Sequence, residues 1–200
     1  MKDPKRSART LNTALNILFL LLLARGIFAA AYHAIALYRI FTDPVALSGE
    51  MGLSVDWLTI QAEQGFGIGL DAAVQMKLVQ LLSAVVITFI GCCAIRVLKR
   101  ILLPIEVGQP FRRGISADIL TLSKCAFWLG MAENLSSMAC VILIENHYDL
   151  PSLLVRDSVT GVSIDWDPKL AWFIAAAVLV ILSMVFRQGE QLQTLADETL

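Results

Sequence analysis

The chain has 200 residues, of which 57% are hydrophobic and only 16% are charged, and its net charge is −1. Soluble globular domains contain roughly 45–50% apolar and roughly 25% charged residues, so this balance excludes an ordinary soluble domain. The small net charge also excludes a strongly basic nucleic-acid-binding surface for the chain as a whole. The composition is typical of an integral membrane protein.

The first long apolar segment covers residues 11–38 and follows a basic N-terminal stretch. A membrane-spanning helix needs about 20 apolar residues, so this segment is long enough to cross a bilayer. A cleaved signal peptide is the alternative, because the small residues at 29–31 resemble a cleavage site. Arg25 interrupts the approach to that site and apolar residues continue to Phe41, which favours a retained helix.

The connection over residues 39–76 contains GLSVDW at 52–57, and the later connection over residues 145–167 repeats the pattern as GVSIDW at 161–166. Alternating aliphatic and polar residues predict a short strand in each copy. In the second connection a hairpin with Gly161 at its turn is expected. We therefore predict that the two connections form a small extracytoplasmic β layer.

Three further segments are long and apolar enough to span, at residues 77–103, 117–144 and 168–187. The connection over residues 104–116 and the tail over residues 188–200 complete the chain. The predicted fold is a single all-α transmembrane domain over residues 1–200, a four-helix membrane bundle.

The sequence also predicts where the third and fourth spans start. Ser116 and Asp118 are the N-cap candidates for the third span. Asp167 followed by Pro168 is typical of an N-cap and first turn, and it marks the expected start of the fourth span.

Positive charges lie on one side of this topology, which predicts the orientation. Nine of them fall in the N-terminal stretch or around the connection after the second span: Lys2, Lys5, Arg6, Arg9, Arg96, Lys99, Arg100, Arg112 and Arg113. The other two connections are acidic instead. We expect a multi-pass protein of the bacterial inner (plasma) membrane with both termini in the cytoplasm.

Arg25 and Glu133 are the main charged residues expected inside the bilayer. Counted from Leu11 and from Ile119, where the apolar segments begin, each lies about fourteen residues into a span that runs outward, or about 20 Å at helical rise, so the two share a depth. An unpaired charge there is costly, so we predict a polar core of Arg25, Glu133 and the neighbouring Asn134. This core is either a structural ion pair or a functional element that binds a ligand or carries protons.

No cofactor or metal site is predicted. All four cysteines (Cys92, Cys93, Cys125 and Cys140) lie in spans without a CxxC pair, and His33 and His147 lack convergent ligands. No nucleophile–base set or metalloprotease motif occurs, so we expect no catalytic residue and no enzyme.

The tail after the fourth span is acidic and has a helical pattern. Phe186, Leu192, Leu195, Ala196 and Thr199 recur at three- and four-residue spacing, while Glu190, Asp197 and Glu198 fall elsewhere. Helices that bind membrane surfaces are normally basic. We therefore expect the tail to pack on the basic inner connection of this chain or on a basic partner.

Two motifs give the chain a family resemblance. One is the ending Phe186-Arg187-Gln188-Gly189 with Leu192, Asp197, Thr199 and Leu200, and the other is Gly108, Pro110 and Phe111 after the second span. The chain resembles the YoaS-like bacterial membrane proteins, a four-span family known as a domain of unknown function. Many members have an Asn shortly after the Pro-Phe pair, where this chain has Gly114-Ile115-Ser116.

The resemblance implies a partner, because members are often encoded beside a small helix-turn-helix regulator of the Cro type. The expectation is a non-enzymatic regulatory or sensing component. It lies in the lipid bilayer, contacts such a regulator through its inner connection and tail, and does not bind nucleic acid directly. The alternative is a small transporter or channel subunit, built as a homo-oligomer around Arg25 and Glu133. A lipid-contacting accessory protein is the third hypothesis.

Overall fold

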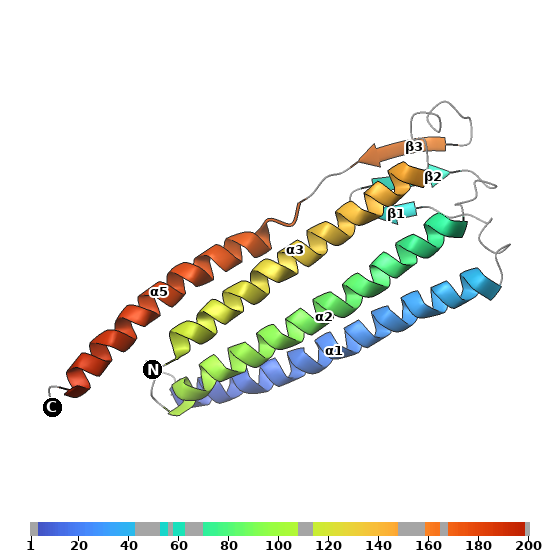
Figure 1. Ribbon diagram of the computed structural model, residues 1–200. Coiled ribbons are helices and arrows are strands. Elements are labelled where there is room, and N and C mark those ends of the chain that lie inside the picture. Colours follow the sequence, from blue (N-terminus) through green and yellow to red (C-terminus); the bar gives the residue numbers. More distant parts are fainter. Residues whose placement is uncertain are drawn as a thin grey trace. The chain divides into compact units, whose positions relative to one another are not determined.

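A computed structural model describes residues 4–42, 53–55, 58–62, 70–107, 114–147, 159–164 and 168–198 (Figure 1). Most of these residues belong to long helices: α1 (Pro4–Thr42), α2 (Leu70–Val107), α3 (Ile115–His147) and α5 (Ala171–Glu198). Short strands lie in two of the connections: β1 (Leu53–Val55), β2 (Leu58–Ala62) and β3 (Val159–Ile164).

Each long helix contains a segment that is long and apolar enough to cross a membrane. These segments are Thr10–Thr42, Ala73–Pro104, Ile115–Leu143 and Ala171–Leu195. Many of their large apolar side chains are exposed, such as Phe28 at 78% and Phe89 at 68%. Exposed apolar faces of this extent fit contact with lipid rather than with water. The chain is a multi-pass membrane protein.

All four long helices are longer than the spans expected from hydropathy. α1 begins at Pro4 instead of residue 11, and α2 begins at Leu70 and continues through Pro104 to Val107 instead of ending at residue 103. Hydropathy identifies only the apolar residues that can lie in lipid. The i→i−4 hydrogen bonds of a helix also form in water, so a helix can extend beyond those residues. Pro104 sits close to the helix end, where it removes one backbone donor without ending the helix.

The strands form one antiparallel sheet in the order β1-β2-β3. β2 is central: Ser54 lies opposite Thr59, and Ser163 lies opposite Thr59 from the other side. The two copies of the repeated sequence pattern thus give the two edge strands. Gly161 lies inside β3 opposite Gln61, next to an irregular register, so the expectation that it forms a hairpin turn is wrong. Glycine at such an irregularity is typical of a bulge.

The described chain forms two compact units, each assembled from several segments. The first contains Met1–Arg25, Ile87–Met131 and Leu170–Leu200, and the second contains Gly26–Val86 and Ala132–Lys169. The sheet belongs to the second unit. Buried apolar residues occur in both units, for example Ile119 in the first and Cys140 in the second, with 3% and 2% exposed.

Within the first unit, α3 and α5 approach closely at Gly130. A Cβ atom built on Gly130 would lie 2.9 Å from Cβ of Trp172 and 3.2 Å from the Phe173 ring. The Phe127 ring also meets Phe173 edge-on, with centroids 5.5 Å apart. Small residues permit this kind of approach between membrane helices, where dispersion contacts replace the hydrophobic effect as the source of attraction.

Candidate functional site

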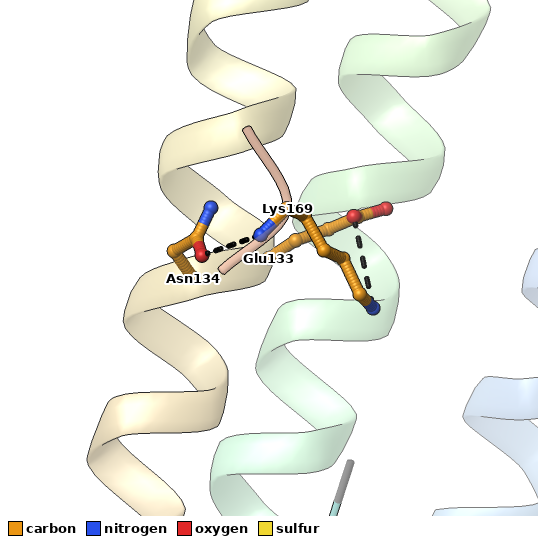
Figure 2. Close-up of polar contacts among 3 residues, drawn as sticks. All are labelled: Glu133, Asn134 and Lys169. Atoms are coloured by element: carbon orange, nitrogen blue, oxygen red, sulfur yellow. Dashed lines mark hydrogen bonds and ion pairs between the residues drawn. The ribbon is translucent and has the colours of Figure 1, made fainter. Parts of the chain in front are cut away.

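The start of α5 carries a cluster of polar groups in the second unit, formed with side chains from α3. Nζ of Lys169 lies 3.8 Å from Oε2 of Glu133, and the backbone N–H of Lys169 donates to Oδ1 of Asn134 over 3.2 Å (Figure 2). The Glu133 side chain is 21% exposed and that of Lys169 is 43% exposed. We call Glu133, Asn134 and Lys169 the α5-start cluster.

Asn134 has a clear physical role in this cluster. The carbonyl of Leu170 accepts hydrogen bonds from the N–H groups of Phe173 and Ile174, so Leu170 is the residue that opens the helix. The N–H of Lys169 lies just before that turn and needs another acceptor. The Asn134 amide oxygen supplies that acceptor.

The prediction that Pro168 lies in the first turn of the last helix is wrong. α5 begins at Ala171, so Pro168 precedes the first turn instead of forming it. The cap is supplied by Leu170 and by Asn134 from another helix. Asp167 lies outside the described residues. A local capping rule considers only neighbouring residues and cannot identify an acceptor 35 positions earlier in the chain, which explains the difference.

The predicted polar core is placed only in part. Glu133 and Asn134 are adjacent on α3, and both contact Lys169, which forms a described ion pair with Glu133. Arg25 is exposed on α1 and belongs to the other compact unit, so the Arg25–Glu133 pair stays a prediction. Lys169 was not among the residues expected in the polar core. Its position directly before an apolar run, antiparallel to the third span, is the signal that could have identified it.

A second polar cluster joins the start of α3 to the tail of α5, in the first unit. Oε1 of Glu190 accepts a hydrogen bond from the Ser116 backbone N–H over 2.8 Å, and Oε2 accepts one from the Ser116 hydroxyl over 3.1 Å. The Ser183 hydroxyl donates to the Ser116 carbonyl over 2.9 Å. We call Ser116, Ser183 and Glu190 the α3-start cluster.

The capping of α3 also differs from the expectation. The carbonyl of Gly114 accepts from the Asp118 N–H over 3.1 Å, so Gly114 is the cap residue and neither Ser116 nor Asp118 is. Gly114 has φ +99°, a left-handed conformation that glycine adopts without a Cβ penalty. The free N–H of Ser116 in the first turn is then bound by the Glu190 carboxylate, a charge-assisted bond at the positive end of the helix.

A further hydrogen bond joins α3 to α5 within the first unit: the buried Ser123 hydroxyl donates to the carbonyl of Ala176 over 2.8 Å. Hydrogen bonds between membrane helices are directional, so a set of this kind fixes the axial register of the helix pair.

The tail is part of α5, which continues to Glu198. Ser183, Phe186, Glu190 and Thr194 lie on one helix face and are at least half-buried, whereas Leu192 and Leu195 are 68% and 59% exposed. Phe186 therefore does not share a face with Leu192 and Leu195, contrary to the expected pattern. A separation of six residues at about 100° per residue puts Phe186 and Leu192 on different faces.

Several predicted residues have no described surroundings. The motif Gly108, Pro110 and Phe111 lies outside the described residues, as do Arg112, Arg113 and Thr199, while Asp197 is described only as part of α5. Gly189 lies on α5, half-buried beside Glu190. Contact between the tail and the basic connection therefore stays a prediction, while contact between the tail and the start of α3 is observed.

Metal ligands do not cluster in the part of the chain that the structure describes: no group of three or more His, Cys, Asp or Glu residues there could hold a metal ion. The His33 ring packs edge-on against Tyr32, with centroids 5.3 Å apart. Its Nδ1 is buried and makes no hydrogen bond among the described residues.

Comparisons with known proteins found no match among family models, curated proteins or solved structures. The resemblance to the YoaS-like proteins therefore stays a prediction, based on the residues quoted for it. Of its closing pattern, Phe186, Gly189 and Leu192 lie on α5 next to the α3-start cluster.

Proposed function

We propose that this chain is a non-enzymatic membrane component of a regulatory or sensing pair, which contacts a cytoplasmic helix-turn-helix regulator through its inner connection and its tail. One observation carries the proposal. The tail is a direct continuation of the apolar α5 helix, and Glu190 fastens it to the first turn of α3. A change in how α3 and α5 pack would therefore alter how the tail is presented.

The proposed orientation places this end of α3 and α5 in the cytoplasm of a bacterium, because the basic residues of the chain gather there. The sheet of β1, β2 and β3 then lies on the extracytoplasmic side. In that position it would cover the outer ends of the helices and offer a surface to an external signal.

The tail face opposite Glu190 is the proposed docking face. Leu192 and Leu195 are one turn apart and exposed, and Glu198 is exposed in the next turn. An acidic face with two leucines complements a basic, partly apolar helix, as on a helix-turn-helix protein. An anionic membrane surface would repel the same face.

The proposal requires that the reading frame adjacent to this gene encodes a small helix-turn-helix regulator, and co-purification from membranes with that regulator as the partner tests it. The double variant Leu192→Ala/Leu195→Ala should reduce recovery of the regulator at least tenfold, because two buried leucines at an interface contribute a few kcal/mol. Gln191→Ala/Gln193→Ala is the matched control on the same turns and should leave recovery unchanged. Equal recovery with both double variants would remove the proposed role of the tail.

A second candidate function follows from the α5-start cluster. Glu133 and Lys169 form an ion pair between α3 and the start of α5, and Glu133 lies inside the apolar segment of α3. Charged residues within a span often mark ion or proton pathways. On this proposal the chain is a homo-oligomeric transporter or channel subunit whose pathway includes Glu133 and Arg25.

Flux measurements on proteoliposomes separate the two candidates. Glu133→Gln should abolish ion or proton flux at normal protein levels if the cluster is a pathway. If that variant instead lowers the amount of folded protein and no flux is seen for the wild type, the cluster is structural and the transporter proposal fails.

A further inference from the structure

Three basic residues gather where the uncharged part of α2 ends. No charged residue lies between Lys77 and Arg96, a stretch of about 28 Å at helical rise, which matches the roughly 30 Å hydrocarbon core of a bilayer. Arg96 therefore lies at the boundary of the hydrocarbon, and Lys99 and Arg100 lie one turn further, at the depth of the lipid headgroups. Their i, i+3 and i+4 spacing places all three on one face of the helix.

Two of these cations are held in place by α1. Nζ of Lys99 lies 2.5 Å from Oδ1 of Asn16 and 5.1 Å from the centroid of the Phe19 ring. The Arg96 guanidinium lies 5.8 Å from the same centroid. The ring attracts both cations through its negative face and limits their motion. A bound anion would thus meet groups that are already ordered, which lowers the entropic cost of binding.

The cations are not neutralised within the described part of the chain. Their described contacts are with Asn16 and Phe19, which carry no charge, and Arg100 is exposed. Like charges at i, i+3 and i+4 repel and destabilise a helix. An anion at this depth would relieve the repulsion.

We propose that Arg96, Lys99 and Arg100 bind the phosphodiester headgroup of an anionic phospholipid, in the leaflet that surrounds this end of α1 and α2. A phospholipid is the occupant because its phosphate is delivered at the depth of these residues, with its acyl chains beside the exposed apolar residues of α1 such as Leu18. A guanidinium is well matched to two phosphate oxygens. The site does not depend on the proposed regulatory function.

Lys77 at the other end of α2 is a natural contrast. It lies 5.9 Å from the Tyr32 ring centroid and donates to Oε1 of Gln80 over 3.2 Å, so it resembles Lys99 in its contacts. It is a single cation, with no basic neighbour at i+3 or i+4. Generic attraction of a basic residue to anionic lipid would be the same at Lys77, whereas a headgroup site requires the three charges together.

The test uses the full chain purified in neutral phosphatidylcholine micelles and titrated with phosphatidylglycerol, with native mass spectrometry of the lipid adducts. The variant Arg96→Gln/Lys99→Gln/Arg100→Gln should bind phosphatidylglycerol about a hundredfold more weakly, at roughly a fivefold loss for each charge. Arg100→Gln alone should cost about fivefold without removing any described contact. Lys77→Gln is the matched control and should leave the affinity unchanged.

Folding and the source of the phosphate are checked in the same experiment. Helicity by circular dichroism should match the wild type, and Arg96→Lys/Arg100→Lys should keep most of the affinity because it keeps the charge. The proposal is overturned if Lys77→Gln weakens binding as much as Arg100→Gln, or if the triple variant binds like the wild type. It is also overturned if an excess of inorganic phosphate displaces the lipid, since the occupant would then be a free anion.

Discussion

The two antiparallel helix pairs of this protein are held together in different ways. α1 and α2 meet through side chains: cations lie over the Phe19 ring, Lys99 donates to the Asn16 side chain, and Cδ2 of Leu22 would lie 2.7 Å from a Cβ atom on Gly91. α3 and α5 meet through hydroxyl and carboxylate hydrogen bonds to backbone groups, with rigid contact at Gly130. Cation–ring and flexible side-chain contacts tolerate small shifts, whereas directional bonds to the backbone do not.

In the function that we propose, a signal would reach the tail through α3 and α5. A helix pair in fixed register transmits a displacement at one end to the other, and in α3 and α5 the far end of that pair is the tail. The α1–α2 pair instead ends in the basic cluster that we assign to lipid. Four substitutions test this contrast, taken from the largest expected effect to the smallest.

Gly130→Ala should have the largest effect. The new Cβ would lie 2.9 Å from Cβ of Trp172, an atom fixed by the backbone, so α3 and α5 must move apart. Overpacking of this kind costs about 1–3 kcal/mol of unfolding free energy. Gly91→Ala is the matched substitution in the other pair, and it should cost less because the end of the Leu22 side chain can rotate away. Thermal unfolding in detergent measures both, and equal losses would contradict the proposed difference.

Glu190→Gln should come next. The amide keeps one acceptor for the Ser116 N–H but loses the negative charge at the start of α3. We expect a loss of about 1 kcal/mol, together with faster hydrogen exchange in the tail after Glu190. Glu198→Gln removes an exposed acid from the same helix and is the control. Unchanged exchange in Glu190→Gln would show that the α3-start cluster does not hold the tail.

Ser123→Ala should have a smaller effect. Its hydroxyl bond to the Ala176 carbonyl joins α3 to α5, and bonds of this kind between membrane helices average about 0.6 kcal/mol. Ser83→Ala removes a hydroxyl that bonds only within α2, to the Gln80 carbonyl, and should cost close to nothing. Unfolding measured at increasing concentrations of a denaturing detergent compares the stabilities of the two variants. A larger loss in Ser83→Ala would mean that the hydroxyl bonds do not fix the register.

Phe19→Leu should have the smallest effect on stability. It removes the ring under Arg96 and Lys99, and exposed cation–ring contacts contribute about 0.5–1 kcal/mol. Phe28→Leu changes a ring on the same helix that is 78% exposed, and it should not alter stability. Equal melting temperatures for the two variants would show that the Phe19 ring does not stabilise the α1–α2 pair.

Much of the architecture could be predicted from the sequence because lipid imposes a local rule. About 20 apolar residues in succession are required to cross, and each of the four spans satisfies that count by itself. Strand patterns at 52–57 and 161–166 were likewise readable, because alternation needs no knowledge of a partner. The helix ends were less accurate, since Pro104 and the residues before 11 continue helices that no longer need to be apolar.

The candidate site was predictable only where it depended on single residues. Glu133 and Asn134 stood out as polar residues inside a span, but the pairing with Lys169 did not. Glu190 was assigned to an acidic tail, while its role at the start of α3 depends on where two helices 74 residues apart in the chain come together. Phe186 and Leu192 shared a spacing pattern but lie on different faces of α5.

By itself the sequence determined that this protein lies in a membrane, how many helices can cross it, and which residues are costly to place there, because transfer into lipid is a sum over neighbouring residues. Only the tertiary structure decided which acceptor binds each backbone N–H group at a helix start, and which residues pair in the sheet. The Lys169 N–H bonds to Asn134, the Ser116 N–H bonds to Glu190, and Gly161 lies within a strand. Such pairings depend on the axial register between segments far apart in the chain, and no local pattern carries that information.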